Sequence, residues 1–211
     1  MVQQDHEYSV LGGLNRAKIG HTIGAIAAII SPLVVSLVLV IISILDYYGI
    51  GDRIPRVIMW PVSAGVIYAG LYWIFSKYAW KYRPLNKFLK VPDLAGEWHC
   101  DGQTINPDRT PSFKWEGTVT ITQNWDKLRI RLKTTQSGSN SIAAALFHDE
   151  VDGFRILYNY KNDPRSDQPE LQPHRGFADI TFRPDLQYGE GEYFNGQGRF
   201  TFGIMKLTRK V

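Results

Sequence analysis

The sequence is poor in the features that mark a secreted protein. It contains a single cysteine, Cys100, which excludes a framework of disulfide bonds within the chain. It also has no Asn-x-Ser/Thr acceptor for N-linked glycans. Both absences favour a reducing, cytosolic environment for the part of the chain outside any membrane.

The motifs of common enzyme classes are absent as well. There is no Gly-x-Ser-x-Gly, no phosphate loop and no His-Glu-x-x-His sequence. His99, His148 and His174 do not share a metal-ligand spacing with Cys100 or with one another. We therefore expect a protein that is not an enzyme and that has no catalytic residues, no metal site and no cofactor.

Charge is missing from two long stretches near the N-terminus. Residues 19–45 and 57–76 contain no Asp, Glu, Lys or Arg and are rich in apolar residues. A spanning helix needs about 20 such residues, and a cleaved signal peptide has a shorter apolar core of about 7–15. The sequence therefore predicts two transmembrane helices, and the short connector at 46–56 makes them an antiparallel hairpin.

The charges that are present predict how this hairpin is oriented. Residues 1–90 hold nine Lys/Arg and four Asp/Glu, whereas the remaining residues hold fifteen and sixteen. Seven of the nine cations flank the spans on the terminal sides and two lie in the connector, so the positive-inside rule predicts that both termini are cytosolic. Because the basic excess belongs to the membrane flanks, polymeric nucleic acid is not an expected partner.

Small residues recur every four positions in both spans. Gly20, Gly24 and Ala28 do so in the first, and Gly65 and Ala69 in the second. Such spacing lets helices approach closely, either within the hairpin or between protomers. The other interpretation is that glycine and alanine are simply common in membrane helices.

After residue 90 the apolar pattern changes to a period of two. The clearest run is 127–133, in which Leu128, Ile130 and Leu132 alternate with cations. About eight such runs are separated by turn sequences, and no long helix is indicated. We predict that residues 91–211 form an all-β domain, an antiparallel meander closed into a lipocalin-like barrel; an open sandwich is the alternative.

The first strand of this domain opens with Gly96-Glu97-Trp98. This resembles the Gly-x-Trp that opens lipocalin-like barrels, in which the tryptophan closes one end beside an arginine from near the C-terminus. Arg199 or Arg209 is expected to supply that arginine.

Several residues of the β domain are candidates for ligand binding, since a small barrel offers an interior or a mouth lined by alternate residues. Aromatic rings provide stacking faces, and guanidinium groups bind phosphates in a bidentate manner. The candidate ligand-binding residues are Trp115, Arg155, Tyr158, Tyr160, Arg175, Phe182 and Arg183. The connection at 162–174 is long for a hairpin loop, so it is expected to be either a binding loop or a surface excursion.

The whole chain resembles a known family, the two-transmembrane, β-barrel effectors of bacterial cyclic-oligonucleotide-based antiphage signalling (CBASS). The resemblance rests on the hairpin followed by the sequence at 78–84, the Pro-Asp-Leu-Ala-Gly-Glu-Trp sequence at 92–98 and the eight-strand domain. It implies an inner-membrane protein whose barrel binds a cyclic dinucleotide, and which then forms a homo-oligomer in the lipid bilayer and disrupts it, killing the infected cell.

Two alternatives stay open at the level of sequence. The protein could be a membrane-tethered, lipocalin-like binding protein for an apolar ligand, with an entirely apolar cavity. It could also be a membrane scaffold without a ligand, with a filled barrel. The sequence does not separate them, because the inward-facing side of each strand is not known.

Overall fold

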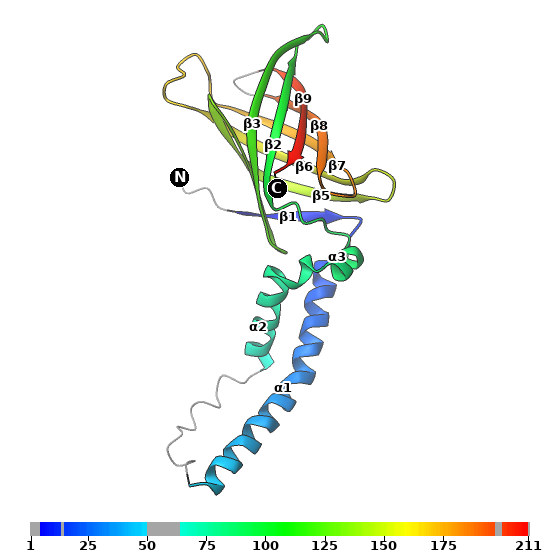
Figure 1. The fold of residues 1–211 in the computed structure, drawn as a ribbon, viewed down its shortest axis with the longest axis vertical. Coiled ribbons are helices and arrows are strands. Elements are labelled where there is room, and N and C mark those ends of the chain that lie inside the picture. Colours follow the sequence, from blue (N-terminus) through cyan, green and yellow to red (C-terminus); the bar gives the residue numbers. More distant parts are fainter. Residues whose placement is uncertain (1–4, 14, 50–63, 197–199, 211) are drawn as a thin grey trace. The chain divides into compact units, whose positions relative to one another are not determined.

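The computed structural model describes residues 5–13, 15–49, 64–196 and 200–210 (Figure 1). The chain divides into two compact units, one comprising Met1–Gly13 with Lys81–Val211 and the other Leu14–Trp80. The first is a β domain and the second is helical. Each is described on its own below.

The helical unit begins with α1 (Arg16–Tyr47), which is capped by the Asn15 side chain; its Oδ1 accepts the Ala17 N–H at 2.8 Å. At 1.5 Å per residue its 32 residues extend about 48 Å, more than the ~30 Å of a bilayer's hydrocarbon core. It is the one helix in the described residues long and apolar enough to cross a membrane. Large apolar side chains along it are exposed, Ile29 and Leu33 by about two thirds, as in helices that face lipid.

The second helix of this unit is α2 (Ala64–Lys77), and residues 57–63 of the predicted second span lie outside the described residues. The two helices contact each other through part of the predicted small-residue pattern. A Cβ atom placed on Gly20 would lie 3.6 Å from the Tyr68 hydroxyl, and one on Gly24 would lie 3.9 Å from the Tyr68 ring. Ala28, Gly65 and Ala69 are exposed in this unit.

The β domain contains the predicted meander. Two short helical segments, η3 (Ala79–Lys81) and α3 (Arg83–Leu89), precede it. Its strands are β2 (Gly96–Ile105), β3 (Pro111–Gln123), β4 (Lys127–Thr134), β5 (Ser137–Asp149), β6 (Gly153–Pro164), β7 (His174–Phe182), β8 (Tyr188–Asn195) and β9 (Phe202–Arg209). Each pairs antiparallel with the next, and β9 pairs with β2, which closes the barrel (Figure 1).

A ninth strand, β1 (His6–Leu11), lies before the helices and was not among the strands predicted from the sequence, which all follow residue 90. Strands β4 and β5 pair directly only near their turn, from Arg131 to Lys133, and β1 occupies the gap where they separate. It pairs antiparallel with the start of β4 and parallel with Ala144–Phe147 of β5. Tyr8 is 3% exposed and donates a hydrogen bond to the Asn124 carbonyl at 3.1 Å. The sheet is therefore mixed, and it includes the N-terminal segment.

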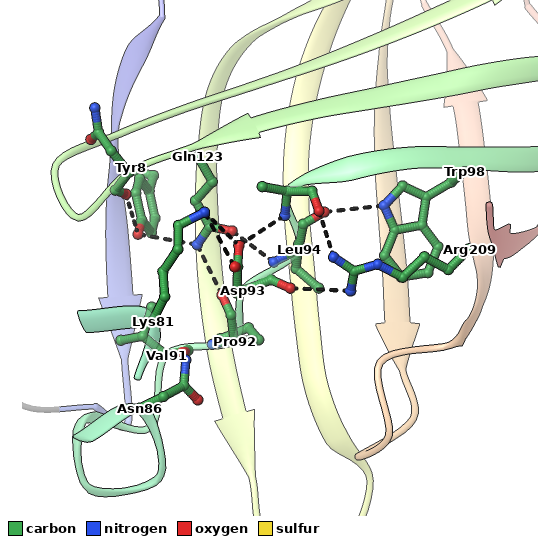
Figure 2. Close-up of polar contacts among 12 residues, drawn as sticks. Tyr8, Lys81, Asn86, Val91, Pro92, Asp93, Leu94, Trp98, Gln123 and Arg209 are labelled. Carbon is green, nitrogen blue, oxygen red and sulfur yellow. Dashed lines mark hydrogen bonds and ion pairs between the residues drawn. The ribbon is translucent and has the colours of Figure 1, made fainter. Parts of the chain in front are cut away.

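One end of the barrel is closed around Trp98 (Figure 2). Its buried ring donates through Nε1 to the Leu94 carbonyl at 3.1 Å and meets the Phe182 ring edge-on at 5.0 Å. The Arg209 guanidinium lies 5.1 Å from the Trp98 ring centroid and donates to the carbonyls of Asp93 and Ala95. Of the two arginines expected beside Trp98, Arg209 occupies this place, and Arg199 lies outside the described residues.

Gln123 joins three segments at this closed end (Figure 2). Its Oε1 accepts the Leu94 N–H at 2.9 Å, and its Nε2 donates to the Pro92 carbonyl at 3.0 Å. The same Nε2 donates to the Tyr8 hydroxyl at 3.3 Å. Because the amide is buried with its partners, it fixes the chain before β2 and also fixes β1 against the end of β3.

We predict that β1 is needed for the stability of the β domain. Tyr8→Ala should lower the free energy of unfolding by about 3–5 kcal/mol, because it empties a buried aromatic site. Ser9→Ala, an exposed position on the same strand, should change it by less than about 0.5 kcal/mol. The measurement is chemical denaturation of a protein in which a short Gly/Ser linker replaces residues 14–80. Equal stabilities of the two variants would contradict the structural role of β1.

Candidate ligand-binding cavity

The half of the barrel away from Trp98 is hollow. A cavity of about 440 Å³ lies between the open ends of the strands, within the range of about 300–1,000 Å³ typical of small-molecule sites. Its wall comes from both the sheet and the connections at this end, including Ser137 after the β4–β5 turn and Leu171 in the β6–β7 connection.

The cavity exists because the inward-facing residues change along the strands, from large apolar side chains at the closed end to polar and aromatic ones at the open end. Strand β6 shows the change most clearly, since its interior positions run Ile156, Tyr158, Tyr160, Asn162 from the closed end to the open one. The closed half is filled by fully buried apolar side chains: Leu128, Leu146, Ile156, Ile180, Phe182 and Leu207. The open half carries hydroxyl, amide and aromatic groups around the empty volume.

Three aromatic rings lie against the cavity wall because glycine sits beside each of them on the neighbouring strand. Gly102 pairs with Trp115, Gly176 with Tyr160, and Gly203 with Tyr193. A Cβ atom on Gly102 would come within 2.0 Å of the Trp115 ring, and one on Gly176 within 2.5 Å of the Tyr160 ring. Glycine therefore lets these rings lie back on the sheet, which leaves the middle of the barrel open.

Hydrogen bonds between side chains hold the aromatic groups in position. The Trp115 Nε1 donates to the Tyr193 hydroxyl at 3.1 Å, and that hydroxyl is 2.9 Å from Thr104 Oγ1. The Tyr160 hydroxyl donates to Asn195 Oδ1 at 2.8 Å. Because partners within the protein fix these rings, the aromatic part of the cavity wall is preorganised.

The inward-facing part of the cavity carries no Asp, Glu, Lys or Arg among the described residues. Its charged lining residues are Lys114 and Glu116, which are exposed and lie on the outward side of β3. Burial raises the pKa of the Tyr158 phenol, so this group stays protonated. Burial also raises the pKa of the Cys100 thiol to about 12, so the thiolate needed for nucleophilic attack is not formed near neutral pH.

The structure brings together three of the residues predicted from the sequence. Trp115, Tyr158 and Tyr160 line the cavity. Phe182 also faces the interior, but at the closed end, where it packs on Trp98 and fills space.

The three predicted arginines do not line the cavity. Arg155 is exposed on the outer face, where its Nε donates to Asp179 at 2.6 Å. Arg183 is exposed, with its guanidinium carbon 4.5 Å from the Tyr188 ring centroid, and Arg175 is exposed as well. The cause is the alternation of side chains along a strand. Each arginine directly follows or precedes a residue that faces inward, so its own side chain faces outward. We do not include these arginines in the candidate site.

Sequence reasoning missed several cavity residues, namely Thr104, Ser139, Asn162, His174, Tyr193 and Asn195. Asn162 was detectable, because it lies two positions after Tyr160 on the same side of β6. His174 and Tyr193 required the register between strands, which the pattern of one strand does not contain.

The fold and the cavity define a class of protein: a β-barrel receptor for a small ligand, tethered to apolar membrane-type helices. The comparisons with known proteins agree. Residues 89–209 match the family described as "Cap15, cyclic dinucleotide receptor domain", and residues 17–81 match "Cap15, TM helices". The chain is also 44% identical over 206 residues to "CD-NTase-associated protein 15" of Yersinia aleksiciae, covering 98% of each.

The chain therefore belongs to the Cap15 family of CBASS-associated proteins, which confirms the resemblance found in the sequence. It has a cyclic-dinucleotide receptor domain and a transmembrane region.

Proposed function

We propose that this protein is an antiphage effector of the bacterial inner membrane that is switched on by a cyclic dinucleotide. The messenger binds in the barrel cavity, the chains assemble in the bilayer, and the membrane is disrupted, which kills the infected cell. The observation that carries the proposal is the cavity itself, an open space with aromatic walls and neutral polar groups in a domain that matches a cyclic-dinucleotide receptor.

The cavity lining favours a nucleotide over the two alternatives. An apolar carrier needs an apolar lining, whereas this one contains buried polar groups such as Ser139, Asn162 and His174. A scaffold would have a filled barrel, and here the open half is empty. Because the interior is neutral, the base of the ligand is expected inside and its phosphates near the mouth, where Lys114 is exposed.

The receptor acts by binding and not by turnover in this proposal. The Tyr158 phenol and the Cys100 thiol are both held protonated by burial, so neither supplies a nucleophile. No group of three or more His, Cys, Asp or Glu that could hold a metal occurs in the portion of the chain that the structure describes.

Assembly can respond to the ligand only if the ligand binds the assembled state more tightly than the free one. Changing from 1% to 99% assembled needs a preference of roughly 10⁴-fold, about 5.5 kcal/mol. The exposed apolar side chains of α1, together with Ala28, Gly65 and Ala69, offer surface for helix association in the bilayer.

The helical region spans the membrane twice with both termini in the cytosol. This arrangement places the receptor where a cytosolic synthase releases its product. Reporter fusions at Val211 and within the connector at 49–51 should give opposite compartments. A C-terminal reporter outside the inner membrane would contradict the topology and the sensing of a cytosolic messenger.

Substitutions in the aromatic wall should weaken ligand binding. Trp115→Ala and Tyr160→Ala should each lower the affinity for a cyclic dinucleotide by about 10–100-fold, because a stacked base contributes roughly 1–3 kcal/mol. Arg155→Ala, on the outer face, should leave the affinity unchanged. The measurement is calorimetric titration of the full-length protein in detergent, with thermal unfolding to verify folding. Weaker binding of the Arg155 variant alone would move the site to the outer face.

Membrane damage should depend on the messenger. Co-expression of the protein with an active cyclic-dinucleotide synthase should let a membrane-impermeant dye enter the cells, whereas an inactivated synthase should not. Trp115→Ala should reduce dye entry at equal protein levels. Equal entry with the active and inactivated synthases would rule out ligand control.

A further inference from the structure

Asn162 contains a buried polar atom to which the described part of the chain supplies no hydrogen-bond partner. Its side chain is on the inward face at the end of β6, is 8% exposed and lines the cavity. Its Nδ2 donates to Ser137 Oγ at 3.1 Å, while its Oδ1 is buried and accepts no hydrogen bond from any residue that the structure describes. A buried carbonyl oxygen left without a donor is unfavourable, and such atoms are rare in folded proteins.

The cross-strand neighbours of Asn162 are polar and form a row across three strands. Ser139 of β5 and His174 of β7 are the cross-strand partners of Asn162. All three side chains are more than nine-tenths buried, and all three line the cavity. The Nδ1 of His174 donates to the Gln172 carbonyl at 3.1 Å, which fixes the ring against the wall.

The aromatic groups adjoin this row. Tyr160 precedes Asn162 by two positions on the same face of β6, and Tyr158 lies 6.0 Å from the Tyr160 ring. The two rings are tilted by 49° to each other, so a flat ring would stack on one of them; stacked on Tyr160, it would lie beside the Ser139–Asn162–His174 row. An amide oxygen accepts hydrogen bonds and cannot donate them, so the group it needs from that ring is an N–H.

We propose that Asn162 selects the base of the bound cyclic dinucleotide, its Oδ1 accepting a hydrogen bond from an exocyclic amino group. This inference rests on the proposed function and adds to it a rule for the ligand. A base with an amino group completes the hydrogen bonding of Asn162, whereas a base with a carbonyl at that position places two acceptors face to face. Sites that are built to bond a donor reject analogues that lack it far more strongly than they reject small changes of shape.

The test uses two pairs of ligands in which one member of each pair lacks an exocyclic amino group that the other carries. Cyclic di-AMP carries an amino group at C6 where cyclic di-IMP has a carbonyl, and N1 of cyclic di-IMP also bears a hydrogen. Cyclic di-GMP and cyclic di-IMP differ only by the amino group at C2. Titration of the full-length protein in detergent should show at least tenfold tighter binding of one of the amino-bearing ligands than of cyclic di-IMP. In Asn162→Leu this preference should fall to less than about threefold.

Two further variants separate the role of the amide from folding. Lys161→Ala, which lies outward on the same strand, should keep the preference of the unaltered protein. Asn162→Asp keeps an acceptor oxygen and should keep part of the preference for the amino-bearing ligand. This variant provides the test if Asn162→Leu does not fold.

The outcomes distinguish this inference from the proposed function. If no cyclic dinucleotide binds the unaltered protein, whether its bases are purines, pyrimidines or one of each, the proposed function fails and the inference fails with it. If all three bind equally, or cyclic di-IMP binds best, the receptor function stands and the role assigned to Asn162 is wrong. If the preference survives in Asn162→Leu, another residue reads the base.

Discussion

The barrel can hold a ligand because Trp98 and its neighbours fill one end completely. In a barrel of eight or nine strands the interior is only about as wide as the side chains that fill it, so an empty volume requires a special arrangement. Here the large apolar side chains gather around Trp98 and Phe182, and the arginine that covers the tryptophan also bonds to the chain before β2. The other half is then free to be lined by small polar groups and by rings lying over glycine. The stable core and the cavity are thus two halves of one interior.

Much of this fold followed from the sequence, and the failures have definite physical causes. Alternation and turn signals located β2–β9, because each of these strands pairs with its neighbour in the chain. They did not reveal β1, whose partners lie far away in sequence and which pairs parallel with β5. For the candidate site, the arginines were predicted because guanidinium groups bind phosphates, and the face of the sheet on which each one lies was not considered. Arg155 and Tyr158 are three positions apart in one strand, an odd spacing that forbids a common face.

Both connections between the β domain and the helices leave from the closed end. A Cβ atom on Gly13 would lie 3.3 Å from the Leu89 carbonyl oxygen, so the segment after β1 runs beside the segment before β2. The ligand cavity is at the opposite end. Strand β3 extends between the two places, with Trp115 in the cavity and Gln123 bonded to Tyr8, Pro92 and Leu94. One continuous strand therefore contributes both to the wall of the cavity and to the bonds at the closed end.

The position of β1 also has a consequence for how the protein is made. Tyr8 bonds to Asn124, 116 positions later, and His6 bonds to Ser141, 135 positions later. During synthesis α1 leaves the ribosome long before those partners exist, so the helix can enter the membrane while β1 is still unpaired. The pairing of β1 with β4 and β5 is then a late step, and contacts between residues so far apart in sequence form slowly. An unpaired strand invites pairing with other chains, and β1 limits this hazard by being only six residues long with Glu7 on its exposed side.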